Sequence, residues 1–78
     1  MKLSIGDLVR LSPISGGIAE LNSSPVGPHS GYSRIVAVWG PNDVGVVVAL
    51  DRSDGRCVCV TGNAGTGWMP GAYLELVR

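Results

Sequence analysis

The stretch that most constrains the fold of this chain reads Gly67-Trp68-Met69-Pro70-Gly71-Ala72-Tyr73-Leu74-Glu75. Pro70 has no amide hydrogen to donate and its φ is fixed near the helical value, so it suits the first position of a 3-10 turn. The small residues after it can complete the turn, and Leu74 resumes an extended chain. The stretch therefore predicts a strand, one 3-10 turn over Pro70 to Tyr73, and a closing strand.

Elsewhere the apolar residues recur with a period of two, which is typical of strands. Residues 12–31 hold four glycines, three prolines and five serines, and are expected to form a long irregular excursion in which a short strand around Ile18 to Leu21 is one option. The glycine-rich residues 62–67 are expected to be a hairpin loop, and Gly45 to mark a bulge or bend. The expected strands cover residues 8–11, 32–39, 44–50, 56–61 and 74–77.

These elements predict the fold class. Five short strands, one long early loop and a 3-10 turn before the last strand are typical of an all-β, small five-stranded barrel. The 78 residues have room for one such domain, spanning residues 1–78. Helix content is expected to be close to a single turn.

Charge and hydropathy exclude several functions. Six basic residues balance six acidic ones, so the chain lacks the positive field that drives sequence-independent binding to nucleic acid. The longest apolar stretches, such as Val44 to Leu50, are far shorter than the ~20 residues that span a bilayer. The first seven residues contain no apolar segment of signal-peptide length. We therefore expect no nucleic-acid or membrane partner, and a cytoplasmic location.

The side chains that usually carry catalysis or bind metals are few. On a strand, Cys57 and Cys59 would point to the same face roughly 7 Å apart, beyond disulfide geometry, and are expected to be reduced. With the sole histidine, His29, they fall short of a four-ligand zinc site. Asp51 and Asp54 flank a hairpin, where such residues commonly form the turn. The chain is therefore expected to be no enzyme and to bind no metal or cofactor.

The aromatic residues are the best candidates for a binding surface. Only Tyr32, Trp39, Trp68 and Tyr73 are present. In one interpretation a tryptophan fills the core and Tyr73 caps it. In the other, Trp68 and Tyr73 are exposed beside Pro70 and form an apolar patch that binds a peptide, a small ligand or another copy of the chain.

The run from Gly67 to Glu75 resembles the closing motif of Src-homology-3 domains, in which a proline, two small residues, a tyrosine, an aliphatic residue and often a glutamate end a small barrel. The resemblance implies an SH3-like barrel with an aromatic groove for polyproline-type peptides, to which Pro70 and Tyr73 would belong. The long loop contains only Glu20 where the family has an acidic patch that selects a basic peptide residue.

The chain is also similar to the plasmid-borne type II dihydrofolate reductases. It shares with them the run Gly6-Asp7-Leu8-Val9-Arg10 and the ending from Pro70 to Glu75. This resemblance implies a tetramer with a shared central pore. Where that family has the valine-glutamine-isoleucine-tyrosine run that contacts folate and nicotinamide, this chain has Thr66-Gly67-Trp68-Met69.

The sequence therefore predicts a non-enzymatic protein- or peptide-binding module of prokaryotic or phage type. It is also expected to form a homo-oligomer, because the strands over 32–39 and 44–50 are apolar on both faces. The alternative is an oligomeric small-ligand-binding protein or enzyme, related to type II dihydrofolate reductase, with a site at its symmetry axis. The predicted binding residues are Trp68, Pro70, Tyr73, Trp39 and Tyr32.

Overall fold

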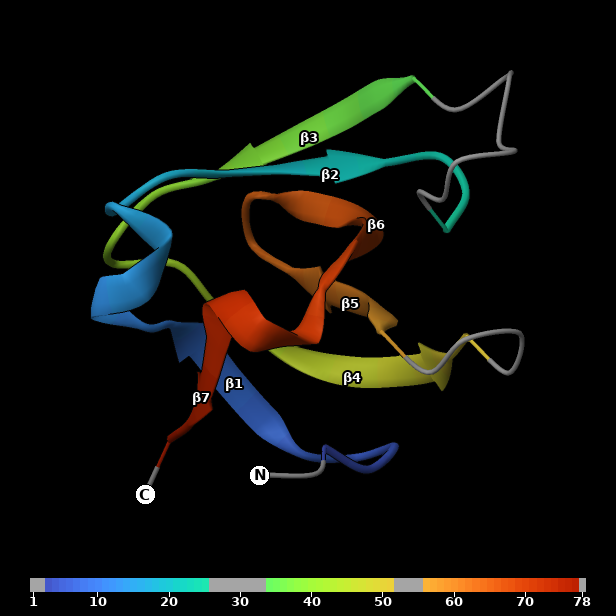
Figure 1. Cartoon of the computed structure of the whole chain (residues 1–78), viewed down its shortest axis with the longest axis horizontal. Helices are drawn as coiled ribbons and strands as arrows, with labels where there is room; N and C mark the ends of the chain where they lie inside the picture. The colour runs from blue at the N-terminus through green and yellow to red at the C-terminus, as the bar shows by residue number, and fades with distance from the viewer. Residues whose placement is uncertain (1–2, 26–33, 52–55, 78) are drawn as a thin grey trace.

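The computed structural model describes residues 3–25, 34–51 and 56–77. Over these ranges the chain is all-β, and its strands form one antiparallel sheet (Figure 1). Within them no helix has the length and apolar character needed to cross a membrane. The strands are β1 (Leu8–Leu11), β2 (Ala19–Asn22), β3 (Ile35–Trp39), β4 (Val44–Leu50), β5 (Cys57–Gly62), β6 (Gly65–Pro70) and β7 (Leu74–Leu76), and the 3-10 turns are η1 (Pro13–Ser15) and η2 (Gly71–Tyr73).

The sheet has the strand order β3-β2-β6-β5-β4-β1-β7. Figure 1 shows it curling from the β2–β3 hairpin through β6 and β5 to β4, β1 and β7. In the described ranges β3 and β7 are the two edges and do not pair with each other, so the sheet is strongly curved but not closed. The expected five strands are thus corrected to seven, and a closed ring of strand pairs is not observed.

All five expected strands are present, two of them with the expected ends. The predictions for 8–11 and 44–50 match β1 and β4. β3 is shorter than expected and starts at Ile35, with residues 32 and 33 outside the described ranges. The irregularity expected at Gly45 lies further along β4, where the pairing with β5 shifts between Val47 and Ala49.

β2 lies where a short strand around Ile18 to Leu21 was one option, and β6 begins inside the segment that was expected to be a loop. The loop expected over residues 62–67 shrinks to a two-residue turn, and β6 begins at Gly65. A Cβ atom on Gly67 would lie 2.8 Å from the Leu21 Cβ and 3.0 Å from the Asn22 carbonyl oxygen, so only glycine lets β6 pass so close to β2. Glycine has low strand propensity, and its frequency here concealed the strand in the sequence.

The core fills the concave side of the sheet. Trp39 is the largest wholly buried side chain, and its indole Nε1–H donates a hydrogen bond to the Gly65 carbonyl oxygen (3.3 Å). Around it lies a cluster of buried apolar side chains drawn from most of the strands. Its other members are Leu3, Val9, Leu11, Ala19, Leu21, Val47, Val58, Val60, Met69 and Leu74.

The two cysteines are free thiols on β5, as expected. Their neighbours Val58 and Val60 belong to the core cluster, so Cys59 lies on the convex face of the strand. Partial burial raises the pKa of the Cys59 thiol, because the uncharged form is favoured where water is excluded. Cys59 therefore stays protonated at neutral pH, which disfavours a nucleophilic role.

Candidate functional site

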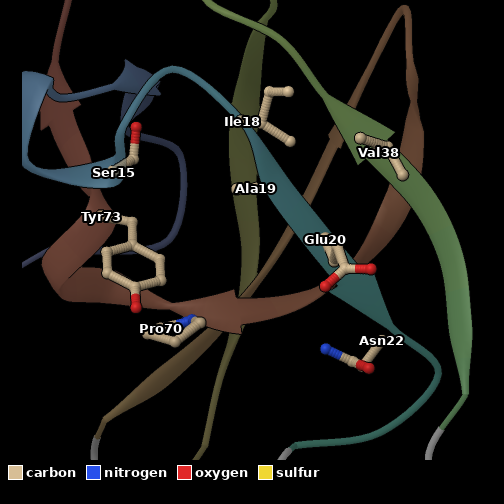
Figure 2. A pocket seen from close by; sticks show the side chains of 8 residues that line it. All are labelled: Ser15, Ile18, Ala19, Glu20, Asn22, Val38, Pro70 and Tyr73. Atoms are coloured by element: carbon tan, nitrogen blue, oxygen red, sulfur yellow. The ribbon is translucent and has the colours of Figure 1, made fainter.

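A groove of about 480 Å³ lies between the end of β6, the turn η2 and the convex face of β2. Figure 2 shows the Pro70 and Tyr73 rings on one side of this opening, with the β2 side chains and Val38 of β3 on the other. Two residues expected in a binding surface are thus brought together. The lining residues are Ser15, Ile18, Ala19, Glu20, Asn22, Val38, Pro70 and Tyr73.

The backbone around Pro70 and Tyr73 is fixed at both ends of η2. The Gly71 amide donates to the Arg56 carbonyl oxygen (2.8 Å), which ties the start of the turn to the chain entering β5. The Ser12 amide donates to the Tyr73 carbonyl oxygen (2.8 Å), which ties its end to the residue before η1. The expected 3-10 turn is confirmed over Gly71–Tyr73, with Pro70 one residue earlier as the end of β6. Both rings are therefore held on a braced backbone, and Tyr73 is 40% exposed.

The opposite wall comes from the alternation of β2. Ala19 and Leu21 are buried in the core, so Glu20 and Asn22 point outward into the groove. Val38 of β3 stands directly opposite Glu20 in the β2–β3 pairing and extends the same wall. Val38 is an exposed apolar side chain, as is Ile18 just before β2. The wall is therefore apolar, with a polar strip formed by two β2 side chains.

The groove carries one charge. Glu20 is the one acidic or basic side chain among its lining residues, and within the described ranges its carboxylate makes no ion pair. An ion pair from Arg10 Nε to Glu75 Oε1 at 3.3 Å joins β1 to β7 away from the groove. A ligand in the groove would thus meet apolar surface and a single negative charge.

The predicted binding residues have different outcomes. Trp68 is half-buried and lies on the same convex face of β6 as Pro70. Its partner in the pairing of β6 with β2 is Asn22, which lines the groove. Trp39 is wholly buried, so its proposed place in a contact surface is corrected to a core position. Tyr32 lies outside the described residues.

The β2 wall of the groove was not predicted from the sequence. Glu20 and Asn22 alternate with buried Ala19 and Leu21, and this period of two was the available signal. The short run is embedded in a segment rich in glycine, proline and serine, which conceals it. Its position beside Pro70 depends on the contact between β2 and β6, which local sequence does not encode.

No metal site accompanies the groove. In the part of the chain that the structure describes, no three histidine, cysteine, aspartate or glutamate side chains lie close enough to hold a metal ion. Comparison of the chain with protein-family models, with curated proteins and with solved structures found no match.

Proposed function

We propose that this chain is a non-enzymatic protein- or peptide-binding module that receives an extended peptide segment in the groove beside Pro70 and Tyr73. The observation that carries the proposal is the juxtaposition of these two rings, on a braced turn, with the apolar wall of β2 and Val38. An open groove of this kind fits a chain segment better than a compact small molecule, which is usually enclosed.

The chemistry of the groove favours a proline-containing segment. A polyproline II peptide is already extended and loses little entropy on docking, and its flat rings pack against aromatic and proline surfaces. Glu20, beside Val38, would attract a lysine or arginine of the ligand. We therefore expect the preferred ligand to combine prolines with one basic residue.

The SH3-like assignment belongs to the same proposal. It is supported by the 3-10 turn directly before β7 and by the long early excursion between β1 and β4. In this chain the excursion contains the β2–β3 hairpin, which supplies one wall of the groove. Of this hairpin, β3 was expected as a strand over residues 32–39, and β2 lies in the segment over 12–31 that was expected to be irregular with a short strand as one option.

Self-association is also part of the proposal. Exposed apolar side chains occur on β3 and on β4, beyond what packing of the core requires. Such surface is typical of interaction sites in small domains.

The proposal is tested by titrating the protein with a proline-rich peptide that contains one arginine, and following Trp68 emission. Trp39 is wholly buried and contributes a constant background. Tyr73→Ala should weaken binding by about tenfold or more, because a packed aromatic anchor is lost. Ile14→Ala, an exposed residue of η1 outside the groove, should bind as the wild type does.

A second pair of variants isolates the charge. Glu20→Gln should weaken binding of the arginine-containing peptide and flatten its salt dependence, whereas Glu75→Gln removes the same charge outside the groove and should do neither. Titrations with NADPH and with folate test the alternative. Saturable binding of either, together with no response to any proline-rich peptide, would overturn the proposal.

A further inference from the structure

Among the strands that the structure describes, β3 has one unpaired edge. Among the described strands it pairs with β2 on one side only, whereas the other end of the sheet is formed by the three-residue β7. An edge strand presents amide and carbonyl groups that can pair with another chain. Natural edges are commonly protected by charged residues, prolines or bulges. Of these devices β3 has only a bulge at Val36, which has no partner on β2 between the pairs Leu21↔Ala37 and Asn22↔Ile35; it has no charged residue and no proline.

The exposed side chains of β3 are apolar. Ile35 and Val38 are both exposed, and Val36 is 46% exposed. An uncharged, apolar edge strand of five residues is a predicted site of strand pairing. The chain has as many basic as acidic residues. Its net charge therefore does not keep two copies apart.

We propose that the edge of β3 pairs antiparallel with the β3 edge of a second copy, giving a symmetric dimer with one continuous sheet. This inference rests on the self-association part of the proposed function and names its surface. The central residues Val36-Ala37-Val38 read the same in both directions. Antiparallel pairing that is centred on Ala37 and continues across the bulge at Val36 places each Val36 opposite a Val38 of the other copy, as a two-fold axis requires.

Charges at the ends of β3 fit the same register. Arg34 directly precedes the strand, and in the described ranges its guanidinium makes no ion pair. Its backbone is held by Ser23, whose amide donates to the Arg34 carbonyl oxygen (2.8 Å). In the symmetric pair Arg34 lies opposite Gly40, whose amide donates to the Asp43 carboxylate. Each end of the interface thus brings a cation of one copy beside an anion of the other.

The test is the solution mass by light scattering from low to high micromolar concentration. The wild type should approach twice its 8.1 kDa monomer mass. Val36→Lys should raise the dissociation constant by about tenfold or more, because the ammonium would face apolar side chains of the second copy. The matched control is Val48→Lys on β4, where the valine is 44% exposed, and this variant should still dimerise.

A second measurement does not depend on the folding of a variant. Amide hydrogen exchange of the wild type should show protection over residues 35–39 that increases with protein concentration. A strictly monomeric wild type overturns the inference, and so does an oligomer that survives Val36→Lys in folded form but is lost in Val48→Lys. Because the peptide titration is measured separately, neither result decides whether the groove binds a peptide.

Discussion

A Trp39→Ala variant is expected to lose most of the stability of the wild type. Trp39 is the largest wholly buried side chain, and it packs against the backbone of β4 and β5 at Gly45 and Gly62. Truncation of a buried tryptophan costs about 3–5 kcal/mol. A domain of this size has a total stability near the lower end of the usual range of about 5–15 kcal/mol. Far-UV circular dichroism and urea unfolding measure the loss directly.

Trp68→Ala is the matched control, because it removes the same side chain from the half-buried convex face of β6. We expect it to fold and to lose clearly less stability than Trp39→Ala. If both variants unfolded at the same urea concentration, or if Trp39→Ala kept the wild-type midpoint, the assignment of Trp39 to the core would be wrong.

The second large effect is expected for Gly45→Ala. A Cβ atom at this position would lie 2.3 Å from Cη2 of Trp39 and 2.4 Å from the Thr61 carbonyl oxygen, distances at which something must move. The indole is enclosed by the core, and the carbonyl belongs to the backbone of β5, so neither can shift cheaply. We expect a loss of about 3 kcal/mol or more, at the upper end for one added methyl group. Urea unfolding measures this loss of stability through the midpoint and slope of the transition.

Gly40→Ala provides the comparison. The nearest atom to a Cβ at Gly40 is the Asp43 Oδ2 at 3.6 Å, an ordinary contact, and its φ is not in the region that favours glycine. The stability of the Gly40→Ala variant should stay within about 0.5 kcal/mol of that of the wild type. Equal and small effects in the two variants would show that β4 and the Trp39 ring are not packed as described.

Much of the fold could be predicted because its signals are local. Period-two alternation gave β1 with its ends, an apolar run between two turn segments gave β4 with its ends, and Pro70 followed by small residues gave η2. The start of β6 could not be predicted, because Gly65 is required by a positive φ and by close approach to Ala37 of β3, and Gly67 by close approach to Leu21 of β2. The inward face of β3 was equally hidden, since apolar residues on both sides leave the position of Trp39 undetermined until β2 packs against it.

The candidate site likewise has one part that could be predicted from the sequence and one part that could not. Pro70 and Tyr73 were predicted because they belong to one contiguous run, and their rings do lie in one groove. The opposite wall comes from β2 and β3, far from that run in the sequence, and it meets β6 through the single register pair Asn22 and Trp68. Contacts of this kind depend on the tertiary fold. Only the outward position of Glu20 was readable from local alternation.

The most direct test of the account is a nuclear magnetic resonance titration of the ¹⁵N-labelled wild type with the proline-rich, arginine-containing peptide. If the groove binds this peptide, saturable amide shifts will be concentrated at residues 18–22, at Val38 and at residues 70–73, around the groove of Figure 2. Shifts concentrated instead on β1, β4 and β7, or no saturable shift with any proline-rich peptide, would contradict it.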